Sequence, residues 1–255
     1  MSNLPKFDYE ARDKSHWEVL EQLFENGNHT IPNILMDWPA YVKRRNISRF
    51  LGHYELFKKV IDLPGSIVEL GVFKGASFFT WAKLLETFCP ADRQRKVFGF
   101  DHFEGLKPEQ FCESDGAIDQ SVDKVPGGYA SIAEDIRTLV ELHNADNLLP
   151  GKERCRLLEG DVFESIPKFL DENPGLSISL LHFDVDLYEP TKFGLEMLYP
   201  LVVPGGVICF DEYGEMPWQG ETNAVNEYFE TLPKDERPVI RKFPFSARPA
   251  GFVVK

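Results

Sequence analysis

Short apolar runs recur along this chain, and each stops at an acidic residue or a glycine. Runs with so little polar alternation are typical of parallel strands that are covered on both faces. The segments between them place apolar residues on one face of a helix. Strands that alternate with helices predict an α/β fold, a Rossmann-like doubly wound and mostly parallel sheet. The predicted parallel strands are Ser66–Leu70, Lys96–Phe100, Cys155–Leu158, Ile178–Phe183 and Val207–Phe210.

The two ends of the chain complete the predicted architecture. Helical periodicity over Tyr9–Phe24 and Ala40–Ile61 predicts an N-terminal helical annex, residues 1–62, before a sheet domain, residues 63–255. Near the C-terminus, Pro238–Phe243 and Gly251–Val254 predict a closing antiparallel hairpin. The expected sheet therefore has seven strands.

Composition narrows the classes of partner. The 255 residues are 43% hydrophobic and 27% charged, as in an ordinary globular protein, and the net charge is −13. Such a negative charge disfavours binding to nucleic acid or to an anionic membrane. The four cysteines lack metal-ligand spacing, Met1–Lys6 contains no apolar signal core, and no run reaches membrane-spanning length. We therefore expect a cytoplasmic protein with reduced thiols.

The first predicted strand runs into the turn Glu69-x-Gly71-x-x-x-Gly75. This spacing is neither the Gly-x-Gly-x-x-Gly of a dinucleotide site nor a P-loop. An acid beside the turn suits a cation, such as the amino group of a methionine-derived cofactor, better than a pyrophosphate. The alternative is a strand-end glutamate in a salt bridge.

Two more strand ends fit a nucleoside pocket. Asp101 ends the second strand, where an acid can bind a ribose diol. Gly160 and Asp161 follow the third strand, where an adenine amino group could find an acceptor. The polar segment 101–128 is expected to be either a lid or disordered. The predicted helix Ala40–Ile61 has a basic face that includes Arg49, which either holds a substrate phosphate or is solvated.

The fourth and fifth strands end in two pairs of acids, Asp184 with Asp186 and Asp211 with Glu212. If these strands are adjacent and parallel, four carboxylates meet at one edge of the sheet. Several carboxylates in proximity need a counterion, and an all-oxygen donor set suits Mg²⁺ or another hard divalent cation. The alternative is that the acids are independent helix-start residues. His182, within the fourth strand, is interpreted as a packed core histidine rather than a ligand.

Four motifs together resemble the macrocin O-methyltransferase family. They are Glu69-Leu-Gly-Val-Phe-Lys-Gly75, Asp101-x-Phe-Glu-Gly105-Leu, Asp184-x-Asp-Leu-Tyr-Glu-x-Thr191 and Pro204-Gly-Gly…Asp211, within about residues 60–230. The resemblance implies an S-adenosylmethionine-dependent enzyme that methylates a sugar hydroxyl, on a nucleotide sugar or a glycosylated natural product. It also implies that the N-terminal annex, residues 1–62, caps the acceptor site and that the enzyme is a homo-oligomer.

The resemblance assigns roles to particular residues. Asp184, Asp211 and Glu212 would bind Mg²⁺, with Glu212 where the family usually has an aspartate, and Asp186 would be the general base. The cofactor would be held by Glu69, Gly71, Asp101 and Asp161. Neighbouring residues are further candidate cofactor contacts: Gly75, Ser77, Phe103, Gly160, Val162 and Asp184.

Three other functions remain open. A metal-dependent catechol or phenol O-methyltransferase often has a lysine three residues after its first metal ligand, where this chain has Leu187. A nucleotide-dependent oxidoreductase would share the fold but normally carries the missing Gly-x-Gly-x-x-Gly motif. A non-catalytic cofactor-binding protein is favoured if Glu212 cannot support metal binding.

Overall fold

The computed structural model describes residues 9–27 and 29–255, with side chains from residue 14, so the N-terminal segment Met1–Lys6 lies outside the described residues. The chain divides into two compact units, one that ends at Ile47 and one from Ser48 to Lys255. The first unit contains α1 (Tyr9–Asn26), α2 (Ile31–Met36) and the 3₁₀ helix η1 (Trp38–Ala40). Thr30 begins α2 as its N-cap, because its hydroxyl accepts a hydrogen bond from the Asn33 N–H.

The boundary between the units falls inside α3 (Arg44–Val60) rather than after it. Leu56, Phe57 and Val60 on this helix are fully buried and belong to a core cluster of the second unit. Burial of this apolar face explains why most of α3 belongs with the sheet.

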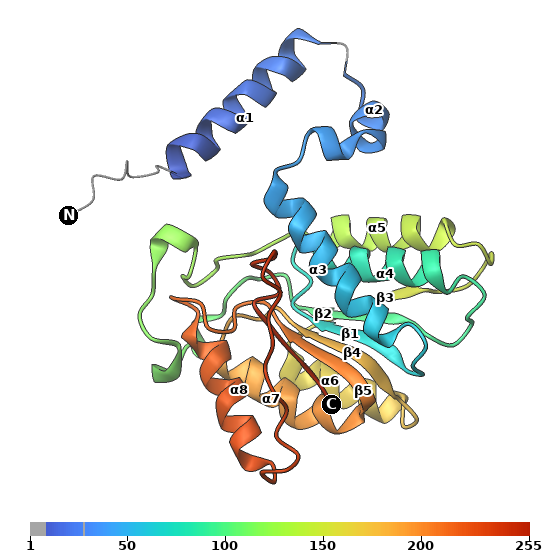
Figure 1. The fold of residues 1–255 in the computed structure, drawn as a ribbon, viewed down its shortest axis with the longest axis vertical. Helices are drawn as coiled ribbons and strands as arrows, with labels where there is room; N and C mark the ends of the chain where they lie inside the picture. Colours follow the sequence, from blue (N-terminus) through green and yellow to red (C-terminus); the bar gives the residue numbers. More distant parts are fainter. Residues whose placement is uncertain (1–8, 28) are drawn as a thin grey trace. The chain divides into compact units, whose positions relative to one another are not determined.

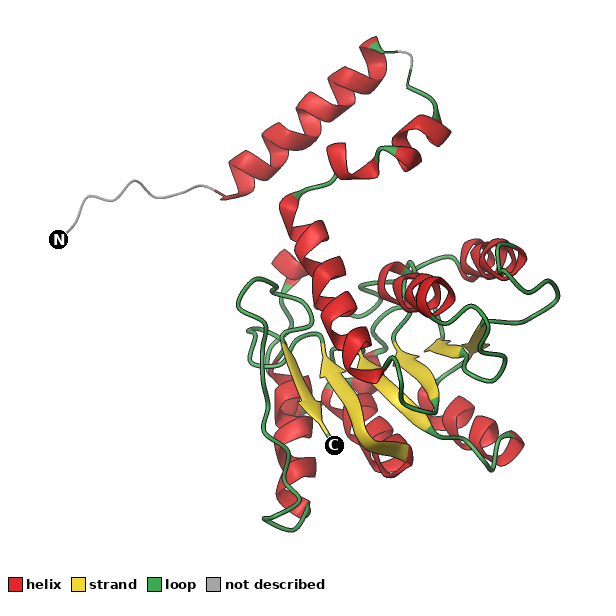
Figure 2. Ribbon diagram, turned by 45° about the vertical axis from the view of Figure 1, so that its right-hand side comes forward, coloured by secondary structure: helices red, strands yellow, loops and turns green. Residues whose placement is uncertain are grey.

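A six-stranded sheet forms the centre of the second unit, counted over the described residues (Figures 1 and 2). The strand order is β3-β2-β1-β4-β5-β6, in which the first five strands are parallel and β6 is antiparallel to β5. This confirms the Rossmann-like doubly wound fold. The strands are β1 (Ser66–Leu70), β2 (Val97–Asp101), β3 (Cys155–Glu159), β4 (Ile178–Phe183), β5 (Val202–Phe210) and β6 (Gly251–Val254).

Helices cover both faces of the sheet, with α3, α4 and α5 on one face and α6, α7 and α8 on the other (Figures 1 and 2). The fully buried Trp81 of α4 packs on the first face, and Leu195 of α7 packs on the second. Strand order reverses between β1 and β4, and ligands bind at such a reversal in open α/β sheets. The five helices after α3 are α4 (Ala76–Phe88), α5 (Ala133–Ala145), α6 (Val162–Glu172), α7 (Tyr188–Leu198) and α8 (Gln219–Thr231).

The prediction of seven strands was wrong by one. Gly251–Val254 forms β6, whereas the segment 238–243 makes only an isolated bridge from Arg241 to Phe252 in the described structure. Proline has no N–H to donate to a ladder, and this segment begins at Pro238 and is followed by Pro244. The expected hairpin is therefore reduced to one strand and one bridge.

The polar segment after β2 contains the 3₁₀ helices η2 (Pro108–Gln110), η3 (Glu113–Asp115) and η4 (Gln120–Val122). Two buried charged residues anchor it. Asp115 accepts hydrogen bonds from the N–H groups of Cys112 and Tyr188, and Lys124 donates to the carbonyl oxygens of Asp115 and Pro217. The segment is therefore tied to the start of α7 and to the loop before α8.

None of the helices within the described ranges combines the length and the apolar character that a bilayer span requires.

Candidate active site

A tight glycine turn joins β1 to α4. Gly71 has φ +89° and Gly75, the N-cap of α4, has φ +82°, both in the region that favours glycine. A Cβ atom on Gly71 would lie 1.8 Å from the carbonyl oxygen of Asp184. The glycine turn and the carboxyl end of β4 are therefore in direct backbone contact.

Asp101 holds this turn from the neighbouring strand. Its Oδ2 accepts hydrogen bonds from the N–H groups of Val72 (2.9 Å) and Phe73 (2.7 Å), and its Oδ1 accepts from Phe103 (2.6 Å). Asp161 has a comparable role at the N-terminus of α6, where it accepts from Phe163 and pairs with Lys107 at 3.1 Å. Both acids organise the backbone around the predicted nucleoside pocket.

A cavity of about 290 Å³ lies at the carboxyl ends of the strands. On the cofactor side it is lined by predicted residues from the glycine turn, α4, β2 and α6: Gly71, Ser77, Asp101 and Val162. Glu69, Gly75, Phe103, Gly160 and Asp161 are not among the described residues that line it. Of these, Glu69 is fully buried behind the turn.

The four predicted acids meet on the other side of the same cavity, because β4 and β5 are adjacent and in register from Leu180 opposite Val207 to Phe183 opposite Phe210. Ligand atoms of Asp184, Asp186 and Glu212 lie within 4.8 Å of one another, and so do those of His182, Asp184 and Asp211. The acids are therefore one cluster rather than independent helix starts, and Asp184 belongs to both groups.

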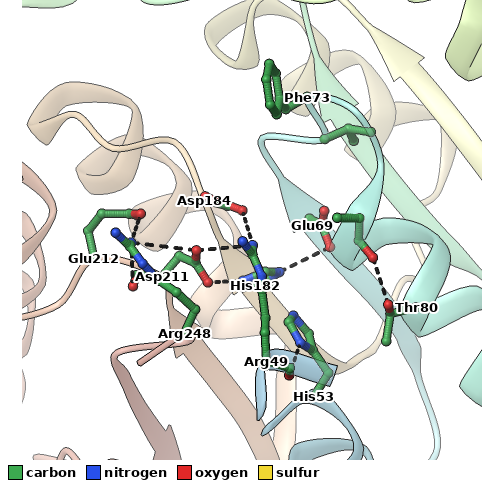
Figure 3. Close-up of polar contacts among 12 residues, drawn as sticks. Arg49, His53, Glu69, Phe73, Thr80, His182, Asp184, Asp211, Glu212 and Arg248 are labelled. Carbon is green, nitrogen blue, oxygen red and sulfur yellow. Dashed lines mark hydrogen bonds and ion pairs between the residues drawn. The ribbon is translucent and has the colours of Figure 1, made fainter. Parts of the chain in front are cut away.

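Two arginines whose contacts with the acids the sequence did not predict neutralise this acid cluster (Figure 3). Arg49 of α3 places Nη2 3.0 Å from Asp184 Oδ2 and 3.2 Å from Asp211 Oδ2. Arg248, in the loop before β6, pairs with Glu212 and lies 3.7 Å from Asp211 Oδ2. The sequence indicates only a basic helix face for Arg49 and no role for Arg248, because neither arginine lies near the acids in sequence.

His182 is fully buried and connects two acids (Figure 3). Its Nδ1 lies 3.1 Å from Glu69 Oε2, and its Nε2 lies 3.5 Å from Asp211 Oδ1. Burial disfavours the charged imidazolium, but the contacts with Asp211 and Glu69 outweigh it and raise the pKa of His182 to about 10. Trp81 Nε1 lies 3.4 Å from the same Nδ1, and we treat it as a packing neighbour because the charged histidine donates its Nδ1 proton to Glu69.

The environment moves the pKa values of the acids apart. Burial raises the pKa of Asp184 to about 8, with Asp211 adding to the rise, and burial raises that of Asp186 to about 7 against the opposing effect of Arg248. Burial also opposes ionisation of Asp211, but Arg49 and His182 hold its pKa below the usual range. Asp211 is therefore the permanently charged member, whereas Asp186 titrates near neutral pH.

Backbone strain is concentrated at this cavity. Phe73, Tyr129 and Asp186 are non-glycine residues with φ values of +51°, +60° and +62°, and all three line it. Each such conformation costs on the order of 1–3 kcal/mol and is characteristic of ligand sites. The Tyr129 ring packs edge-on against Phe73. Its role in the site was missed because no local pattern marks a left-handed tyrosine.

Comparison with known proteins gives a consistent set of relatives. A family model described as Macrocin-O-methyltransferase (TylF) matches residues 34–239, a wider range than the motifs alone indicated. The 8-demethyl-8-(2,3-dimethoxy-alpha-L-rhamnosyl)-tetracenomycin-C 4'-O-methyltransferase of Streptomyces olivaceus is 31% identical over 182 residues, 69% of this chain. The match spans 65% of the length of that relative. Demethyldecarbamoylnovobiocin O-methyltransferase of Streptomyces niveus is 27% identical over 219 residues, 85% of this chain and 79% of that protein.

Solved structures agree with these relatives. The crystal structure of CalS11, a calicheamicin methyltransferase, matches with a TM-score of 0.84 and 28% identity over 100% of this chain and 99% of that one. An apo structure of CalS11, described as a TDP-rhamnose 3'-O-methyltransferase, matches with a TM-score of 0.76 and 27% identity over 100% and 96% of the two chains. The family match extends over most of this sequence. The chain therefore belongs to the macrocin O-methyltransferase family of enzymes.

Proposed function

We propose that this protein is an S-adenosylmethionine-dependent, divalent-metal-assisted O-methyltransferase that acts on a sugar hydroxyl. The acceptor is a nucleotide sugar or a glycosylated natural product, the class named for the relatives. The observation that carries the proposal is that one cavity is lined by the glycine turn on one side and by the acid cluster on the other.

The residues around the glycine turn fit a nucleoside-bearing cofactor. Gly71, Ser77, Asp101 and Val162 line the cavity, and the strained turn keeps its backbone close to whatever occupies it. When bound, S-adenosylmethionine supplies a methyl group attached to a positively charged sulfur. Loss of the methyl group leaves this sulfur as a neutral thioether. The nearby carboxylates favour that positive charge.

The acid cluster fits a hard cation. All of its donors are oxygens, and one buried oxygen, Glu212 Oε2, has no hydrogen-bond partner among the described residues. Asp184, Asp211 and Glu212 would hold the ion, which would polarise the acceptor hydroxyl and make its proton easier to remove. The longer side chain of Glu212 already reaches the cluster, because its oxygen lies within 4.8 Å of ligand atoms of Asp184 and Asp186.

Asp186 is positioned to act as the general base. It lines the cavity, and its pKa, raised to about 7, suits proton transfer near neutral pH. Asp186 would take the proton of the acceptor hydroxyl, and the deprotonated oxygen would then accept the methyl group that bound S-adenosylmethionine supplies. The ring of Tyr129, on the same cavity, would form an apolar wall for the sugar.

The same proposal includes the cellular location and the oligomeric state of the enzyme. The four cysteines are free, which suits a cytoplasmic protein, and a homo-oligomer is expected from the family.

The proposal is tested by release of S-adenosylhomocysteine on a matched panel of nucleotide sugars, glycosylated aromatic compounds and catechols. We expect turnover with sugar acceptors, loss of turnover in EDTA and recovery with Mg²⁺. Turnover confined to catechols would favour the phenol O-methyltransferase alternative. Failure to bind S-adenosylhomocysteine would refute the proposal as a whole.

A further inference from the structure

Three buried ionisable side chains form a row across the middle of the sheet: Glu69, His182 and Asp211. Glu69 of β1 lies directly opposite His182 of β4, and His182 lies opposite Cys209 of β5. Asp211 follows two positions after Cys209, so an extended strand end directs its side chain to the same face. The row runs from the strand that carries the glycine turn to the strand end that carries the proposed metal ligands.

An imidazole lies between two carboxylates along this row, with its two nitrogens 3.1 Å from Glu69 Oε2 and 3.5 Å from Asp211 Oδ1. Glu69 and His182 are 0% exposed and Asp211 is 2% exposed. Buried polar groups of this kind have no contact with water, so each depends on its partner in the protein, and loss of one partner leaves the other uncompensated. The geometry of Asp211 therefore depends on His182, and the geometry of His182 depends on Glu69.

Glu69 does not reach the cavity. It is not one of the described residues that line the cavity, and its Oε2 is committed to His182 at 3.1 Å. Its other oxygen, Oε1, is buried and makes no hydrogen bond to any described residue. The contact that the structure shows for this carboxylate is therefore with His182 rather than with the cavity.

We propose that Glu69 is a positioning residue for the metal site: its carboxylate holds His182, and His182 fixes the orientation of Asp211. This inference rests on the proposed function, because it requires a divalent cation at the acid cluster. It changes the role of Glu69 from holding the methyl donor to supporting a metal ligand two strands away. Replacement of such supporting groups typically weakens metal affinity by about 10–100-fold.

The test measures two affinities separately on the full-length protein. Mn²⁺ binding is followed by electron paramagnetic resonance and S-adenosylhomocysteine binding by calorimetry, for wild type, E69Q, H182N and the double variant E69Q/H182N. We expect E69Q and H182N each to weaken Mn²⁺ binding by about 10–100-fold while leaving the S-adenosylhomocysteine affinity within about twofold of wild type. Because the two residues act in series, the double variant should bind Mn²⁺ no more weakly than H182N alone.

Matched variants separate this effect from loss of folding. Glu86 forms an ion pair with Arg154 at 2.7 Å away from the cavity, so E86Q removes a partly buried carboxylate without touching the row. It should leave both affinities unchanged. E69D keeps the charge but shortens the reach to His182, so a folded E69D with weakened Mn²⁺ binding supports the inference even if E69Q is unstable.

Two results would overturn the inference. One is an E69Q protein that loses affinity for S-adenosylhomocysteine but keeps its affinity for Mn²⁺, which would show that Glu69 binds the cofactor. The other is an E69Q protein that keeps both. Wild-type protein that binds no Mn²⁺ would instead contradict the metal-assisted function on which the inference rests.

Discussion

Substitution of Gly71 by alanine provides a direct test of how the cofactor turn is joined to the acid cluster. The added Cβ would lie 1.8 Å from the Asp184 carbonyl oxygen, and backbone rather than a flexible side chain would have to move. Overpacking of this kind costs about 1–3 kcal/mol, and a left-handed non-glycine residue costs about 1–3 kcal/mol more. G71A should therefore be destabilised by roughly 2–6 kcal/mol, a large part of the ~5–15 kcal/mol stability of a typical protein.

Two other glycines separate the two contributions. Gly127 has φ +80° with no atom within 4 Å of a built Cβ, so G127A carries the conformational cost alone. Gly175 has neither a positive φ nor a close neighbour, so G175A should unfold like wild type. Urea unfolding followed by circular dichroism should rank stability as G175A above G127A above G71A. If G71A unfolded at the same urea concentration as G175A, the inferred contact between the glycine turn and the end of β4 would be refuted.

Three further predictions concern the acid cluster itself. D186N should lower kcat by about 10²–10⁴-fold while S-adenosylhomocysteine binds normally, and undiminished turnover by this variant would exclude Asp186 as the base. In the wild type, kcat/KM should rise with pH through about 7, because Asp186 acts as a base only when it is deprotonated. R49M should tighten Mn²⁺ binding in a direct titration, since Arg49 occupies the Asp184 and Asp211 oxygens that the ion needs; weaker binding would show that Arg49 supports the site instead. Glu221 of α8 lies behind the cluster, where it is fully buried and accepts a hydrogen bond from the Glu212 N–H at 2.8 Å. Burial raises its pKa well above the usual range, so this carboxyl weakens folding progressively as the pH rises above the pKa of the unfolded state. E221Q should therefore raise Tm at pH 7 and leave Tm at pH 4 almost unchanged, and equal shifts at both pH values would contradict this.

The parts of the fold that could be predicted from sequence are those encoded locally. A buried parallel strand is apolar almost throughout, so the acids at Asp184 and Asp211 stand out as strand ends, and adjacency of β4 and β5 brings them together. The segment 238–243 was wrongly predicted to form a strand, because its residues favour a strand but the prolines at its start and just after its end limit the ladder.

The parts that could not be predicted depend on which residues meet through tertiary packing. Arg49 reaches the acids from a helix, and Arg248 reaches them from the loop before the last strand, so no spacing identifies either. His182 had been interpreted as a packed core histidine, and it is fully buried as that interpretation requires. Its two acidic partners became apparent only with the register of three neighbouring strands.

The proposed function requires a methyl donor and a divalent cation to occupy the same cavity. Nuclear magnetic resonance can test this with S-adenosylmethionine that carries a ¹³C-labelled methyl group, bound to the protein and titrated with Mn²⁺. We expect Mn²⁺ to broaden the methyl resonance strongly, EDTA to restore it, and D184N to remove the effect at a Mn²⁺ concentration that saturates wild type. A methyl resonance that stays sharp when both ligands are bound to the wild-type protein would show that the donor and the ion do not share the cavity.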